Sequence, residues 1–150
     1  MKKILFLICL FIFQFSHAVD PQLNVNFKPT KEKIATEASD KIEVIEMFWY
    51  GCGHCYSFEP ELKKWQASLP KEIVFKKIPA VPRKDWIPMA RAYYAMESLG
   101  VLNDLHSKIF EAIHKDKTLS PVDEDGAIKW MASNAKLGTD TVKAGCKSLT

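Results

Sequence analysis

The firmest feature of the hydrophobic pattern is the run Ile-Glu-Val-Ile-Glu-Met-Phe-Trp-Tyr at residues 42–50. Because apolar side chains fall on both faces of this segment when it is extended, it predicts a central β-strand that is covered on two sides. An alternation of apolar and polar residues over positions 23–27 predicts an earlier, half-buried strand, and Pro29 ends it. Residues 73–78 predict a further strand.

Between the two later strands, residues 52–69 have the spacing of an amphipathic helix that ends at Pro70. Pro60 removes a backbone hydrogen bond within this helix and predicts a kink rather than a stop. The predicted buried stripe consists of Phe58, Leu62, Trp65 and Leu69. A strand, a helix and a strand in one sheet predict a parallel, right-handed crossover, which places position 52 at the carboxyl end of the first of these strands.

Helical periodicity then continues from about residue 84 to residue 150. Asp85 is predicted to cap the first helix of this block, with Pro88 in its first turn and Gly100 at its end. The positions expected to be buried share helical spacing: Met89, Ala92, Tyr93, Met96, Leu99, Leu102, Leu105, Ile109, Ile113, Ile128, Met131, Ala132, Val142, Cys146 and Leu149. The parallel strand–helix–strand unit, followed by a block of helices, predicts an α/β fold.

The N-terminus predicts export. Two lysines, the apolar run at 4–15 and small residues up to Ala18 have the order of a secretory signal peptide over residues 1–18, cleaved after Ala18. The run covers about a dozen residues, whereas a membrane-spanning helix needs roughly twenty. Cys9 is not expected to carry a lipid, because a bulky residue precedes it. The remaining residues 19–150 suffice for one compact domain.

The charge balance excludes one class of partner, and the cysteines indicate a type of chemistry. The formal net charge is +3, and it falls to about +1 without the two lysines of the signal peptide, so no nucleic-acid binding is expected. Three cysteines remain in the mature chain, Cys52, Cys55 and Cys146. A close pair with one distant cysteine indicates chemistry, because a structural disulfide framework uses even numbers at wider spacing.

Cys52 and Cys55 form a predicted redox-active pair. Three residues apart at the start of a helix, they lie on the same side of its first turn, close enough to form a small-ring disulfide. Cys52 would occupy the helix entrance, where free N–H groups and the helix dipole favour an anion. Such sites lower a thiol pKa from about 8.5 to roughly 3.5–7.5, which makes the disulfide a stronger oxidant. Cys52 is therefore the predicted nucleophile.

Two neighbours have candidate roles with alternatives. His54 could donate a hydrogen bond or positive charge to the Cys52 sulfur, or it could be an exposed polar residue in a tight turn. Glu46 is a carboxylate within an apolar strand, where burial would raise its pKa. It could then exchange a proton with Cys55 through a bridging water molecule. Alternatively, it reaches the edge of the sheet as an ordinary charge.

Other uses of the cysteines are less favoured. A zinc site would need two more ligands, but Cys146 is distant and His106 and His114 lie eight residues apart, so no metal is expected. A purely structural disulfide across so short a loop would stabilise the fold little. Cys146 shares a helical face with Val142 and Leu149, which predicts a buried free thiol, with a regulatory or intermolecular disulfide as the alternative.

The stretch from Glu46 to Pro60, Glu-Met-Phe-Trp-Tyr-Gly-Cys-Gly-His-Cys-Tyr-Ser-Phe-Glu-Pro, resembles the DsbA-type periplasmic disulfide oxidases of the thioredoxin superfamily. The resemblance implies a thioredoxin-like fold with an inserted helical subdomain. It also implies the following roles: Cys52 the exposed attacking cysteine, Cys55 the buried resolving cysteine, His54 the thiolate-stabilising histidine and Glu46 the buried proton-transfer carboxylate.

The same resemblance implies a working context. The expected protein is a periplasmic monomer without a cofactor, which oxidises thiols of reduced or unfolded exported proteins at an apolar groove beside Cys52. A membrane quinone-linked partner of the DsbB type would reoxidise it.

Two departures from the family pattern keep alternatives open. Gly53 stands where the family usually has proline, and Gly-His is typical of protein disulfide isomerases. The family's cis-proline loop and last strands follow the helical insertion, here about residues 84–150, so we expect a fragment that lacks the second half of the sheet. The alternatives to an oxidase are an isomerase or reductase of the same fold, a dithiol metal-binding module and an inactive fragment.

Overall fold

The computed structural model describes residues 19–32, 34–36 and 40–147, and it divides the chain into two units, residues 1–35 and residues 36–150. The predicted signal peptide and its cleavage site after Ala18 lie outside the described residues, as does Leu149.

The described part of the first unit contains a turn in place of the predicted strand at 23–27. Leu23 and Phe27 form only an isolated bridge, and Asn24 adopts the left-handed conformation with a φ of 64°. The Asn24 N–H donates to the Phe27 carbonyl at 2.7 Å, and the side chain of Asn26 accepts from the Gln22 N–H at 2.9 Å. Local hydrogen bonds of asparagine thus bend a segment whose apolar alternation predicted an extended one.

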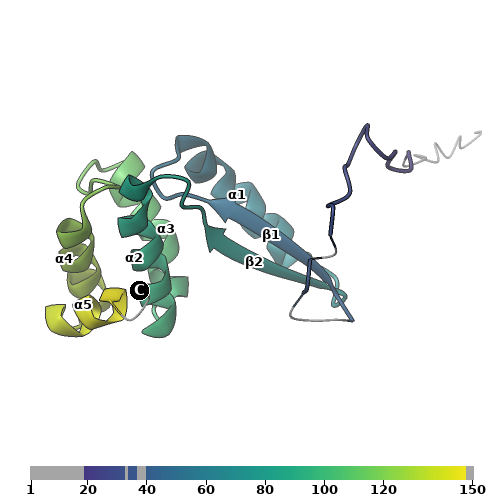
Figure 1. Cartoon of the computed structure of the whole chain (residues 1–150). Coiled ribbons are helices and arrows are strands. Elements are labelled where there is room, and N and C mark those ends of the chain that lie inside the picture. The colour runs from purple at the N-terminus through teal and green to yellow at the C-terminus, as the bar shows by residue number, and fades with distance from the viewer. Residues whose placement is uncertain (1–18, 33, 37–39, 148–150) are drawn as a thin grey trace, which may run out of the picture. The chain divides into compact units, whose positions relative to one another are not determined.

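The second unit contains the predicted strand–helix–strand crossover (Figure 1). Strand β1, Ile42–Phe48, pairs in parallel with β2, Ile73–Pro79, and helix α1, Gly53–Ala67, connects them. Pro60 lies inside α1, which continues through it. The carboxyl end of β1 lies shortly before the start of α1, as the sequence predicted.

The helical block is also confirmed. It comprises a short 3-10 helix, η1, Lys84–Trp86, and the helices α2, Ile87–Ser98, α3, Leu102–His114, α4, Glu124–Ala135, and α5, Thr139–Lys147. Figure 1 shows α2 to α5 gathered beyond the carboxyl ends of the strands, whereas α1 runs alongside them. Asp123 caps α4 by accepting from the Gly126 N–H at 3.0 Å. The predicted cap at Asp85 is wrong, because its carboxylate pairs with Arg83 and Trp86 precedes α2.

The hydrophobic core joins the end of β1 to the helices. Phe48 is fully buried and meets the Tyr93 ring edge-on, with 5.5 Å between the ring centroids. Helices α2 to α5 supply most of the other buried side chains, among them Met89, Met96, Leu105, Ile109, Phe110, Met131 and Val142. Burying each such side chain stabilises the fold by roughly 1.5–3 kcal/mol relative to its exposure. The segment that leads to Cys52 therefore starts from the buried end of the strand.

Two burial predictions are wrong for the described residues. Strand β1 is not covered on both faces, since Met47 is 69% exposed and Ile45 is also exposed. In the predicted stripe of α1 only Leu62 is buried, whereas Phe58 is 53% exposed and Trp65 is exposed as well. Helix α1 directs Leu62 and Glu59 inward. Phe58 and Trp65 of α1 line a groove together with Ile45 of β1.

Within the described ranges, no helix is both long enough and apolar enough to cross a membrane.

Candidate functional site

The redox motif lies where β1 passes into α1. A tight turn makes this connection, with the Cys52 N–H donating to the Trp49 carbonyl at 2.9 Å. Gly51 lets the Trp49 ring approach the turn closely, because a Cβ at position 51 would lie 2.5 Å from this ring and would displace it. Cys52 is the N-cap of α1 in an extended conformation, with a φ of −85° and a ψ of 113°. The predicted position of Cys52 at a helix entrance is therefore present in the structure.

Cys52 has the surroundings of a stabilised thiolate. Its Sγ accepts a hydrogen bond from the Cys55 N–H at 3.3 Å, and both residues are free thiols, so the structure describes the dithiol form. Partial burial opposes ionisation, but hydrogen bonds from the Cys55 side chain, from its backbone and from the backbone of His54 lower the pKa of Cys52 below its ordinary value. Donors at the open end of the helix thus favour the anion.

Cys55 has the opposite properties. It is less exposed than the helix surface around it and packs against the hydrophobic core. Burial raises the pKa of Cys55 to about 11, assisted by its hydrogen bond to Cys52 and by the negative charges of Cys52 and Glu46, while a backbone hydrogen bond at Trp49 acts in the other direction. The two thiols of the motif therefore differ in which protonation state the protein favours.

His54 acts on Cys52 through its backbone in this structure. The residue is exposed in the first turn of α1, and its backbone N–H contributes to the lowered pKa of Cys52. Among the described residues, no hydrogen bond joins the His54 imidazole to the Cys52 sulfur.

Glu46 belongs to an ion-pair cluster that was not predicted from the sequence. The strand register sets Glu46 opposite Lys77, and the Lys77 Nζ lies 2.6 Å from Glu46 Oε2. Lys77 also bridges to Glu59 of α1. Glu46 is thus mostly buried but paired, which differs from both sequence-based expectations, the isolated buried acid and the edge charge. The predicted parallel pairing of residues 42–50 with residues 73–78 could have indicated that Lys77 lies opposite Glu46.

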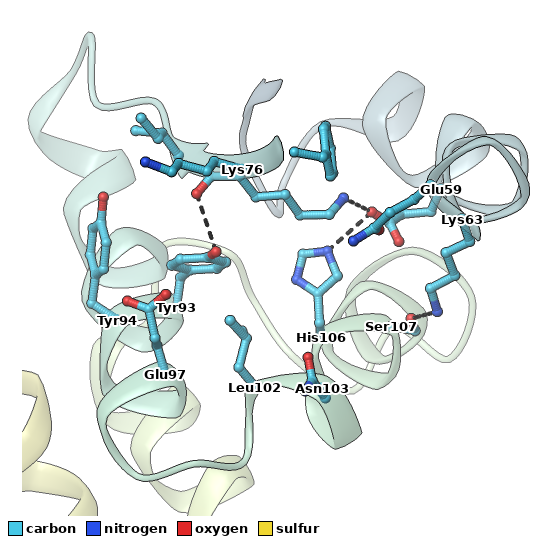
Figure 2. A pocket seen from close by; sticks show the side chains of 14 residues that line it. Glu59, Lys63, Lys76, Tyr93, Tyr94, Glu97, Leu102, Asn103, His106 and Ser107 are labelled. Carbon is cyan, nitrogen blue, oxygen red and sulfur yellow. Dashed lines mark hydrogen bonds and ion pairs between the residues drawn. The ribbon is translucent and has the colours of Figure 1, made fainter. Parts of the chain in front are cut away.

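Glu59 is the most deeply buried acid of this cluster, at 5% exposure. Burial opposes its ionisation, but hydrogen bonds and charge interactions with His106 and Lys77 outweigh burial and lower the pKa of Glu59 to about 2. Figure 2 shows the His106 ring directed at the Glu59 carboxylate, and both residues line a cavity of about 520 Å³ between α1, β2, α2 and α3. Tyr93 closes part of this cavity and donates to the Lys77 carbonyl at 3.1 Å.

Two histidines of α3 contact the chain just before the cysteine pair. His106 is 6% exposed, and its Nδ1 lies 2.7 Å from the Tyr50 hydroxyl while its Nε2 lies 3.1 Å from Glu59 Oε1. His114 Nε2 lies 2.7 Å from the Tyr50 carbonyl oxygen. From the sequence alone these two histidines were only candidate zinc ligands, and their spacing argued against that role. In the part of the chain that the structure describes, no group of three or more His, Cys, Asp or Glu side chains could hold a metal ion.

Cys146 lies away from this site, in α5. It is buried with a free thiol, and burial raises the pKa of Cys146. This surrounding agrees with the predicted buried free thiol.

The fold and the site together define a dithiol protein of the thioredoxin-like α/β class with an inserted helical subdomain. No family model matches the chain. The thiol:disulfide interchange protein DsbA of Pseudomonas aeruginosa is 46% identical over 76 residues, which are 51% of this chain and 36% of that protein. DsbA of Bordetella pertussis is 32% identical over 128 residues, 85% of this chain and 57% of that protein.

A solved structure agrees with these relatives. The structure of oxidized PaDsbA1 with a triazol-4-amine compound is 30% identical and superposes with a TM-score of 0.74, covering 87% of this chain and 68% of that one. The chain belongs to the DsbA family of thiol:disulfide oxidoreductases, which confirms the predicted resemblance and fold. It spans between 36% and 57% of the length of the two curated relatives.

Proposed function

We propose that this chain is a thiol:disulfide oxidoreductase that donates the Cys52–Cys55 disulfide to thiols of exported proteins. The observation that carries the proposal is the contrast within the motif, where the pKa of Cys52 is lowered and the pKa of Cys55 is raised to about 11. A lowered thiolate pKa stabilises the reduced pair, so its disulfide is a good oxidant. The names of the DsbA relatives support the same reaction class.

The reaction consists of two thiol–disulfide exchanges. A substrate thiolate attacks Cys52 Sγ of the oxidised pair, a mixed disulfide forms, and the Cys52–Cys55 bond breaks. The electron pair goes to Cys55, which takes up a proton because its thiol form is favoured. A second substrate thiolate then attacks the substrate sulfur of the mixed disulfide and releases Cys52 as a thiolate. The substrate gains a disulfide, and the pair ends with two more electrons.

Two further residues have roles in this proposal. Glu46 exchanges the proton with Cys55, since its charge acts on the Cys55 thiol and it is held in place by Lys77. His54 stabilises the Cys52 thiolate through its backbone N–H, while its side chain lies exposed on the surface that a substrate would approach.

The proposed setting is the periplasm, reached through a signal peptide at residues 1–18 that is cleaved after Ala18. The clients are reduced or unfolded exported proteins, the reoxidant is a membrane quinone-linked protein of the DsbB type, and the chain acts as a monomer without a cofactor. This setting is supported by the N-terminal sequence and by the kinship with DsbA proteins.

An isomerase or reductase is the second candidate, and Gly53 is the observation that favours it. Gly53 is exposed in the first turn of α1, and a Cβ added at this position would meet no atom within 4 Å, so no packing constraint requires glycine there. The residues between the two cysteines influence the redox poise, and this dipeptide is not the one usual in the oxidase family.

The reduction potential of the Cys52–Cys55 pair tests the proposal. We expect equilibration of the full chain with glutathione buffers to give a potential near the oxidase value of about −120 mV, well above the thioredoxin value of about −270 mV. The oxidised chain should then transfer its disulfide stoichiometrically to a reduced two-cysteine peptide, and Cys52→Ala should not. A potential near the thioredoxin value would instead support a reductase.

A further inference from the structure

Tyr50 is held at both of its ends by one helix of the inserted subdomain. The Tyr50 hydroxyl lies 2.7 Å from Nδ1 of His106, and the Tyr50 carbonyl oxygen lies 2.7 Å from Nε2 of His114. Tyr50 is 1% exposed, so neither of these polar groups has ready access to bulk water. Cys52 follows two residues later. Helix α3 therefore holds the turn that leads to Cys52 through two hydrogen bonds with Tyr50.

The partners determine where the protons lie. The Tyr50 carbonyl can only accept, so His114 Nε2 carries the hydrogen in this contact. Glu59 is ionised, because its pKa is lowered to about 2, and His106 Nε2 therefore donates to it. Burial raises the pKa of Tyr50 well above its usual value, so Tyr50 keeps its proton, and its hydroxyl shares one hydrogen bond with Nδ1 of His106. Every hydrogen bond in this series from Tyr50 to Glu59 has one donor and one acceptor.

His114 also contacts the other side of the cysteine pair. Its ring stacks on Tyr56, with 5.1 Å between the centroids and 14° between the planes. Tyr56 directly follows Cys55, and Tyr50 comes two residues before Cys52. A single imidazole from α3 thus contacts the chain on both sides of the redox motif.

We propose that His106 and His114 of α3 are positioning residues that hold Tyr50, and with it the turn before Cys52, in the arrangement that stabilises the Cys52 thiolate. This inference rests on the proposed function. The thiolate is stabilised by donors at the start of α1, including the Cys55 N–H at 3.3 Å from Sγ. If the turn relaxes, the sulfur moves relative to these donors and the reduced form loses stabilisation.

Variants of the full chain separate the contacts. His114→Phe keeps a ring that can stack on Tyr56 but removes the donor to the Tyr50 carbonyl. His114→Gln keeps a donor N–H, and Tyr50→Phe removes only the hydroxyl that meets His106. Ile128→Val, a conservative change in the buried face of α4, serves as the control for a general loss of stability.

The readouts are the thiolate absorbance of Cys52 against pH and the equilibrium of the pair with glutathione. We expect His114→Phe and Tyr50→Phe to raise the pKa of Cys52 by about one unit and to move the equilibrium about tenfold towards the disulfide. His114→Gln should restore most of the wild-type equilibrium, and Ile128→Val should unfold at a lower temperature with the wild-type equilibrium.

Two negative results have different meanings. If wild-type Cys52 titrates like an ordinary thiol, the proposed function itself fails. If wild-type Cys52 is acidic but His114→Phe and Tyr50→Phe keep its pKa and its glutathione equilibrium, the proposed function stands and the positioning role is overturned. If His114→Phe does not fold, Tyr50→Phe still tests the His106 contact, since it leaves the carbonyl contact of His114 intact, and an unchanged Cys52 pKa in this variant overturns the positioning role of His106.

Discussion

Cys52 and Cys55 lie three residues apart, yet the two thiols have different neighbours and pKa shifts of opposite direction. The first lies at the open entrance of α1 among N–H donors, and its pKa is lowered. The second packs against the core and lies near the charge of Glu46, and its pKa is raised to about 11. One turn of helix is therefore enough to make two chemically identical thiols unequal.

This difference shows that the opposite pKa shifts of the two thiols arise from their positions at the start of a helix. A helix entrance provides unpaired N–H groups wherever it occurs. The interior side of the same turn is partly buried because β1 ends against the helical block, where Phe48 and Tyr50 are fully covered. The strand–helix junction thus produces both surroundings at once.

The largest expected effect is a difference in reactivity between the two thiols. With a pKa of about 11, Cys55 is almost entirely protonated at neutral pH, while the pKa of Cys52 lies below its ordinary value. We expect limited iodoacetamide treatment of the reduced wild-type chain to modify Cys52 about a hundredfold faster than Cys55, measured by mass spectrometry of peptides. The urea-unfolded chain is the control, in which the cysteines should react at similar rates. Equal alkylation rates of Cys52 and Cys55 in the folded chain would contradict their opposite pKa shifts.

A second prediction concerns Glu59, the buried acid on the inward face of α1. Glu59 has a folded-state pKa of about 2 against an ordinary value of 4.5, so its ionised form stabilises the fold. This contribution is complete above about pH 4.5 and is lost as the pH falls towards about 2, because the unfolded state then binds the proton first. Its size is roughly 3 kcal/mol. We expect Glu59→Gln to flatten the acid limb of the stability curve, measured by urea unfolding between these pH values.

The matched control for this measurement is Glu61→Gln on the same helix. Glu61 forms an exposed ion pair with Lys64, which contributes little to stability. Its substitution should leave the acid limb in place. If both variants keep the wild-type pH dependence, the buried cluster does not anchor the interior side of α1.

Much of the fold could be predicted from local patterns. The crossover, the helical block and the helix entrance at Cys52 followed from periodicity and from the positions of Gly and Pro residues. The exposure of Ile45, Met47, Phe58 and Trp65 did not follow, because an apolar residue shows a preference for burial but not which element covers it. In the described residues β1 has only β2 as its neighbour, and part of the apolar surface of β1 and α1 stays open.

The site shows a similar division. Cys52 and Cys55 are close in sequence, so their spacing alone placed them together. The cluster of Glu46, Lys77 and Glu59 joins three elements, and His106 reaches it from a fourth. Such contacts depend on tertiary packing, and a single sequence gives no direct signal for them. Only the pair Glu46 and Lys77 could have been found, from the register of two predicted parallel strands.

The smallest expected effect is the influence of the Glu46 charge on the pKa of Cys55. Glu46 is the weakest of the influences that raise the pKa of Cys55. We expect Glu46→Gln to lower the pKa of Cys55 by less than about one unit, because it removes a negative charge but leaves the burial of the thiol unchanged. The measurement is the pH dependence of Cys55 alkylation. Glu43→Gln is the control, since Glu43 pairs with Lys76 on the other face of β1 and should not affect Cys55. If the two variants change Cys55 equally, the effect is a general loss of negative charge, and the proton-transfer role proposed for Glu46 loses its physical basis.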